Sequence, residues 1–120
     1  MSFHEIKKDA KIVDEILLYL LKNDHDEVSI NIKREQDEVF ITFKCTKLSD
    51  DIIKSMDKYI NKERELEMEE YGWELMGESD GQSDLSMVGL LIDKLTIDNS
   101  NPDYTVLKLT RHYKKSKKIR

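Results

Sequence analysis

The sequence is poor in the residues that cross-link small extracellular domains or create special backbone sites. Its 120 residues include one cysteine, Cys45, one proline, Pro102, and four glycines. A single cysteine excludes an internal disulfide and a zinc site built on a cysteine pair. The longest apolar run, residues 16–21, is too short to span a bilayer, and the first residues lack an apolar signal segment. We therefore expect a soluble, cytoplasmic protein without a membrane partner.

Catalytic and metal-binding motifs are also lacking. The sequence contains no Gly-x-Ser-x-Gly, Gly-Lys-Ser/Thr or His-Glu-x-x-His pattern. His4, His25, Cys45 and His112 do not have the spacing of metal ligands. Because Cys45 ends an apolar strand face, we interpret it as a small core residue rather than a nucleophile. We predict no catalytic residue, metal or cofactor, and lean towards a protein that is not an enzyme.

Charge is abundant but unevenly distributed. The net charge is −5, and residues 63–84 carry nine acids against one base, Arg64. Residues 111–120 carry six bases and no acid. Charge runs of this kind are usually solvated, so we interpret both segments as surface and residues 113–120 as a disordered basic tail. Clustered bases can bind nucleic-acid phosphates, but the acidic body of the chain argues against a nucleic-acid partner.

The first half of the chain shows clear periodicity. Its length and 38% hydrophobic content fit one domain, which we place at residues 1–112. Apolar residues recur every three or four positions over residues 5–22, which predicts an amphipathic helix. Apolar and polar residues then alternate over residues 28–32 and 39–43, on either side of a polar turn. This alternation predicts a β-hairpin with one buried face.

The second half is expected to add helices and two closing strands. Ser49 is a candidate cap for a helix over residues 50–61, and residues 62–78 are predicted to be a charged helix broken near Gly72. After a turn-rich loop, residues 84–95 are predicted to form the most buried helix, followed by strands near residues 96–98 and 104–111. The predicted fold is an α/β (two-layer α+β) sandwich. Its helices cover one face of a mixed or antiparallel four-stranded sheet, in the order α-β-β-α-α-α-β-β.

This order resembles the ATP-binding domain shared by histidine kinases, anti-sigma-factor kinases, gyrase and mismatch-repair ATPases. In that family a Glu-x-x-x-Asn helix precedes a hairpin, an Asp-x-Gly-x-Gly turn, a mobile lid, and a Gly-rich turn before a buried helix. Here Glu15 falls at the helix glutamate, whereas Tyr19 stands at the metal-binding Asn position. Residues 43–49 replace the Asp-x-Gly-x-Gly turn without a glycine, and residues 86–95 keep only Gly89 of the Gly-Leu-Gly-Leu segment.

The resemblance implies a degenerate ATPase-like domain that has lost its nucleotide. If ATP did bind, the resemblance would direct it to Glu15, Gly77, Gly81 and Gly89. The leading hypothesis is a non-catalytic intracellular interaction or regulatory module whose partner is a protein or a second copy. The alternatives are an active ATP-binding protein of the anti-sigma or histidine-kinase type, and a homodimeric structural domain. The candidate contact surface is acidic and aromatic, since such aromatics are frequent at interfaces; it comprises Glu67, Glu70, Tyr71, Trp73 and Glu74.

Overall fold

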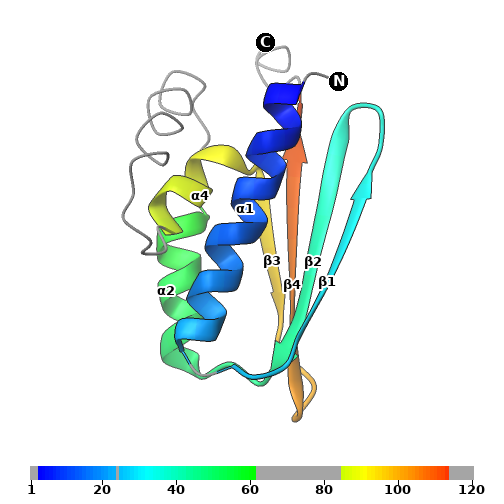
Figure 1. Ribbon diagram of the computed structural model, residues 1–120. Helices are drawn as coiled ribbons and strands as arrows, with labels where there is room; N and C mark the ends of the chain where they lie inside the picture. Colours follow the sequence, from blue (N-terminus) through cyan, green and yellow to red (C-terminus); the bar gives the residue numbers. More distant parts are fainter. Residues whose placement is uncertain (1–2, 24, 62–84, 114–120) are drawn as a thin grey trace.

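The computed structural model describes residues 3–23, 25–61 and 85–113 (Figure 1). Its elements follow the predicted order wherever the chain is described. They are α1 (Phe3–Lys22), β1 (Val28–Arg34), β2 (Glu38–Thr46), α2 (Asp50–Ile60), α4 (Leu85–Leu91), β3 (Lys94–Asp98) and β4 (Tyr104–His112). The helix predicted over residues 62–78, with its break near Gly72, lies outside the described residues.

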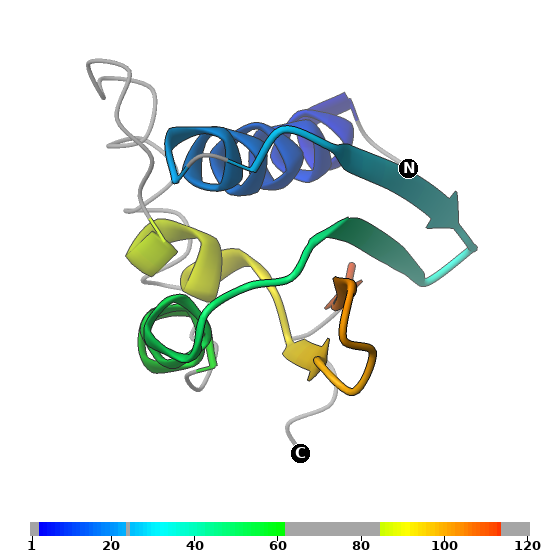
Figure 2. The ribbon, with the colours of Figure 1, turned by 90° about the horizontal axis from the view of Figure 1, so that it is seen from below.

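The four strands form one antiparallel sheet in the spatial order β1-β2-β4-β3. Each of the two hairpins, β1-β2 and β3-β4, contributes one inner strand, and β2 pairs with β4 at the centre. The three described helices lie on one side of this sheet (Figures 1 and 2). The predicted α+β class, helix layer and four-stranded sheet are therefore confirmed, and the sheet is antiparallel rather than mixed.

The core lies between the helix layer and one face of the sheet. Residues of β2 and β4 alternate between buried and more exposed positions, as the period of a half-buried strand requires. Cys45 is buried on the inner face, which confirms its interpretation as a core residue. The main apolar side chains of the core are Ile12, Ile16 and Leu20 from α1, Val39, Ile41 and Phe43 from β2, Met56 and Ile60 from α2, Val88 and Leu91 from α4, and Leu107 and Leu109 from β4.

Side chains at both ends of α2 fix its position. At the N-terminus the Ser49 hydroxyl accepts a hydrogen bond from the backbone N–H of Ile52 at 3.3 Å, so the predicted cap is confirmed. At the C-terminus the Asn61 side chain donates to the carbonyl of Leu95 at 3.2 Å and accepts from the Leu95 N–H at 3.1 Å. This pair of hydrogen bonds ties the end of α2 to β3.

Helix α4 is shorter than the sequence predicts. It ends at Leu91, whereas apolar periodicity extended the prediction to residue 95. The N–H of Asp93 donates to the carbonyl of Thr110 at 2.8 Å, and Leu95 is already paired within the sheet. Residues 93–95 are therefore paired with β4 and do not continue the helix. Four of the seven α4 residues are buried, against six of 20 in α1 and two of 11 in α2, so α4 is the most buried of the three described helices.

Gly89 allows α4 to lie directly against the backbone of α2. A Cβ atom at this position would be 2.6 Å from the carbonyl oxygen of Tyr59 and 3.0 Å from that of Ile60. Real Cβ atoms do not approach backbone so closely, so any larger residue would push the two helices apart. The absence of a side chain at Gly89 is therefore a packing requirement.

We predict that Gly89→Ala destabilises the protein by about 1–3 kcal/mol, the usual cost of overpacking a rigid contact. The helix propensity of alanine opposes this loss by only about 1 kcal/mol. Urea unfolding followed by circular dichroism measures the change. Ser86→Ala, a substitution in the same helix that removes an atom rather than adding one, is the control. An unchanged midpoint for Gly89→Ala would show that α2 and α4 can separate freely.

Candidate functional site

The residues to which the resemblance directs a nucleotide are used for packing where the structure describes them. Glu15 is 1% exposed, and its carboxylate lies 3.4 Å from the ammonium group of Lys11 one turn earlier. Tyr19, at the position of the family's Asn, packs partly buried against the core. Gly89 lies against α2, as described above. The other predicted positions lie outside the described residues, namely Gly77 and Gly81 and the contact residues Glu67, Glu70, Tyr71, Trp73 and Glu74.

At the end of β2, where the resemblance would place the adenine-reading turn, side chains contact neighbouring segments of the sheet. The Thr46 hydroxyl lies 2.8 Å from the imidazole Nδ1 of His25, which joins the start of the hairpin to its end. Burial raises the pKa of the Cys45 thiol, which disfavours the reactive thiolate. The Leu48 N–H donates to the hydroxyl of Thr105 at 3.0 Å. These contacts connect the end of β2 to the residues before β1 and to the start of β4.

Arg111 corrects the expectation that the basic residues from position 111 onward form a solvated surface. Its side chain is 1% exposed. The guanidinium Nη1 donates to the carbonyl of Leu91 at 2.6 Å, Nη2 pairs with Glu5, and Nε lies 3.5 Å from a carboxylate oxygen of Asp9. Burial of a charge is tolerated only with such partners. The sequence could not reveal them, because the acids are on α1, roughly a hundred positions away.

Asp9 also accepts a hydrogen bond from the Tyr113 hydroxyl at 2.7 Å. Burial raises the pKa of Asp9, while the Tyr113 hydroxyl and the charge of Arg111 act in the opposite direction. The pKa of Tyr113 is raised above its ordinary value of 10.0 by burial and by its hydrogen bond to Asp9. The Tyr113 N–H donates to the Asp37 carbonyl at 2.9 Å. These contacts fix the chain at the end of β4 to α1 and to the β1-β2 turn.

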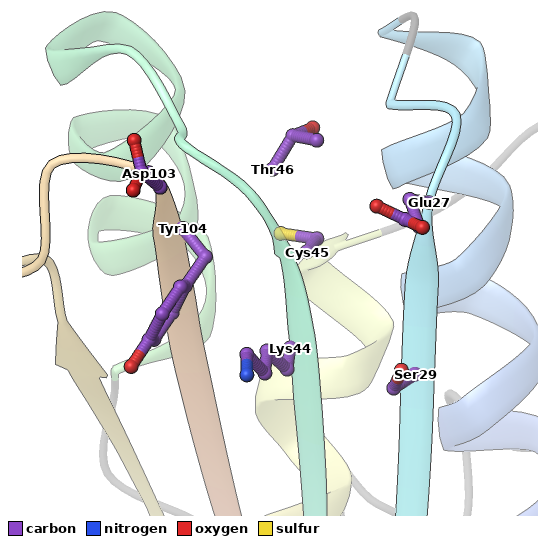
Figure 3. A pocket seen from close by; sticks show the side chains of 7 residues that line it. All are labelled: Glu27, Ser29, Lys44, Cys45, Thr46, Asp103 and Tyr104. Atoms are coloured by element: carbon purple, nitrogen blue, oxygen red, sulfur yellow. The ribbon is translucent and has the colours of Figure 1, made fainter.

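A shallow pocket of about 390 Å³ opens near one end of the sheet. Its lining comes from β1, β2, β4 and the residues just before β1 and β4 (Figure 3). The ammonium group of Lys44 lies 4.1 Å from the centre of the Tyr104 ring, a cation–π contact. The lining mixes acids with one lysine and has no activated nucleophile; it comprises Glu27, Ser29, Lys44, Cys45, Thr46, Asp103 and Tyr104.

The histidines lie in separate places. His25 contacts Thr46, and Nδ1 of His112 lies 3.1 Å from a carboxylate oxygen of Glu38. Over residues 3–23, 25–61 and 85–113, no group of three or more His, Cys, Asp or Glu side chains could hold a metal ion. His25 and His112 therefore contribute contacts between neighbouring segments of the sheet.

The outer strand β1 exposes apolar side chains that sequence analysis expected to be buried. Ile30 is paired with Phe43 and Ile32 with Ile41, so both isoleucines point to the face that carries the helices. Nevertheless Ile30 is 39% and Ile32 is 49% exposed. The C-terminal end of β1 extends past α1 and away from the helices (Figures 1 and 2). Alternation along the strand correctly predicted which face these side chains share, but it did not predict how much of that face the helices bury.

Comparisons of the chain with protein-family models, with curated proteins and with solved structures gave no match. Each helix in the described part of the chain is too short or too polar to cross a membrane.

We predict that Tyr113→Phe lowers the free energy of unfolding by about 1–2 kcal/mol near neutral pH, because the buried Asp9 loses a hydrogen-bond donor. The raised pKa keeps Tyr113 protonated in the folded state at a pH where the unfolded chain begins to ionise. The stabilisation is therefore complete below pH 10.0 and declines as the pH rises above that value. In urea unfolding, the free energies of unfolding of wild type and Tyr113→Phe should therefore converge as the pH rises above 10.0.

Tyr104→Phe is the matched control, since it removes a hydroxyl from the outer face of the sheet and leaves the ring beside Lys44 in place. We expect it to change stability by less than about 0.5 kcal/mol. A constant difference between wild type and Tyr113→Phe across the alkaline range would contradict the linkage.

Proposed function

We propose that this protein is a non-catalytic, intracellular interaction or regulatory module, built on an arrangement that resembles the histidine-kinase type of ATP-binding domain but does not bind nucleotide. The order of the described elements supports the resemblance. A helix, a hairpin, a second helix, a buried helix and two closing strands follow one another as the resemblance implies. The lone buried thiol, Cys45, is compatible with a reducing compartment.

The observation that carries the proposal is that Gly89 and Glu15 both make structural contacts within the chain. A glycine that approaches a phosphate must present open backbone, but Gly89 presents its backbone to Tyr59 and Ile60. A carboxylate that orients water must reach the substrate, but Glu15 is buried and ion-paired with Lys11. Both residues have structural partners in the positions where the resemblance would have them meet a ligand.

The interaction role is supported by the edge of the sheet. An edge strand offers unpaired backbone groups to another strand, and natural proteins usually protect such edges. Strand β1 is an edge and adds the exposed side chains of Ile30 and Ile32. Addition of a strand to an exposed edge is a common way for proteins to bind one another. The acidic and aromatic segment containing Trp73 remains a second proposed contact, argued from the sequence alone.

We predict that titration of the protein with ATP and Mg²⁺ in a calorimeter gives no binding heat and that ATP does not raise the melting temperature. A ligand at 100 times its Kd would stabilise the folded state by about 2.7 kcal/mol, which thermal unfolding detects easily. Glu15→Gln, which preserves the shape of the buried side chain, should behave in the same way. Micromolar ATP binding that is lost in Glu15→Gln would instead identify an active nucleotide site.

A further inference from the structure

The backbone of β1 has a row of groups that point away from the sheet. The Glu35 N–H donates to the carbonyl of Glu38 at 2.8 Å, so these two residues form a hydrogen-bonded pair at the turn. In an antiparallel ladder, hydrogen-bonded and non-hydrogen-bonded pairs alternate. Counting back from Glu35, the N–H and C=O groups that face outward belong to Arg34, Ile32, Ile30 and Val28.

The same positions carry the exposed apolar side chains. Ile30 and Ile32 combine an outward-facing backbone with side chains that are partly open on the helix-side face. The other edge of the sheet differs, because β3 is only five residues long, its Leu95 is buried, and Asn61 bonds to it from α2. Among the described elements, β1 is therefore the edge prepared for a further strand.

The charges at the two ends of β1 indicate which strand would fit. The exposed acids Asp26 and Glu27 precede it, and the exposed bases Lys33 and Arg34 end it. A second β1 running in the opposite direction about Asn31 places Lys33 and Arg34 diagonal to Glu27 and Asp26 of the partner subunit, and it also places Glu27 opposite Glu35 of the partner subunit. A parallel copy in the same register would instead place bases beside bases and acids beside acids, which is destabilising.

We propose that β1 pairs with β1 of a second copy in antiparallel orientation, around a two-fold axis at Asn31. This inference rests on the proposed function and names its partner. The two four-stranded sheets would join into one sheet of eight strands. Such an interface is isologous, which is the commonest arrangement in dimers.

This register satisfies both the backbone and the side chains. Ile30 faces Ile32 of the partner subunit in a hydrogen-bonded pair, so each outward N–H and C=O of these residues finds an acceptor or a donor. The four isoleucines meet on the helix-side face. On the opposite face, Lys33 lies diagonal to Glu27 of the partner subunit, a separation that long side chains can bridge. Lys33 is also 3.5 Å from Glu35 within its own chain, and its side chain is 69% exposed.

Sedimentation equilibrium of the full chain over a range of concentrations tests the proposal. We expect a dimer whose Kd rises at least about fivefold in Lys33→Glu, because reversal at one position alters two symmetry-related charge contacts. Adding Glu27→Lys to Lys33→Glu should restore the dimer, since positions 27 and 33 again carry opposite charges. Restoration is expected from antiparallel pairing, and the next variant tests that pairing without a change in net charge.

Ile32→Pro provides a test that does not depend on charge. Proline removes the outward N–H of residue 32 but no hydrogen bond between β1 and β2, so the fold is retained and the dimer is lost. Tyr59→Lys, which removes an exposed aromatic side chain from α2, is the control and should leave dimerisation unchanged. Circular dichroism confirms that each variant is folded.

A wild-type protein that stays monomeric at millimolar concentration would overturn this proposal. A dimer indifferent to both Lys33→Glu and Ile32→Pro would also overturn it, because another surface would then hold the copies together. Neither result bears on nucleotide binding. Conversely, ATP binding in the calorimeter would refute the proposed function but would not alter the expected response of the dimer to these substitutions.

Discussion

The burial of Arg111 is the constraint on which the arrangement of this fold depends. A guanidinium removed from water costs several kcal/mol unless it is paired and hydrogen-bonded. Arg111 meets that requirement with Glu5 and Asp9 on α1 and with the last carbonyl of α4. The contacts hold the first turns of α1 over the end of the central strand β4. The position of α1 across the sheet therefore follows from one charged side chain as well as from apolar packing.

The helix layer covers β1 incompletely. Ion pairs hold α1 to β4, and α4 contacts both α1 and α2, so the three described helices form one layer on the sheet. Helix α1 lies on the β1 side of this layer, and the C-terminal end of β1 extends past it (Figure 2). The side chains of Ile30 and Ile32 point to the helix side, as alternation requires, but they are 39% and 49% exposed. The exposed edge therefore lies where the strand extends further than the helix that packs beside it.

Local patterns allowed most of the secondary structure to be predicted. The alternation in β1 and β2, the periodicity of α1 and the cap at Ser49 are all encoded within a few residues of one another, and the structure confirms them. The features that were missed depend on distant parts of the chain. Helix α4 ends early because Asp93 bonds to Thr110 on β4, and Arg111 is buried because its acidic partners are on α1. Neither partner can be recognised from the neighbouring sequence.

The candidate site was harder to predict for a related reason. A lone glycine or glutamate has the same appearance in a sequence whether it serves a ligand or a packing contact, and only its neighbours decide. Gly89 faces the backbone of α2, and Glu15 faces Lys11. Both positions therefore have structural partners in this fold. The exposure of β1 could not be predicted at all, since alternation indicates a face but not what covers it.

The charged residues of β1 influence which strand can pair with this exposed edge, and in which orientation. A lysine on an edge strand ordinarily discourages other strands from pairing with it, because a charged side chain loses hydration when a neighbour approaches. Lys33 is 69% exposed on this edge, and the net charge of −5 opposes association of copies of the chain at a distance. Antiparallel pairing of β1 with itself brings Lys33 near Glu27 of the partner subunit. The same residues that oppose random association then favour one orientation, so protection of the edge and choice of partner have a single physical origin.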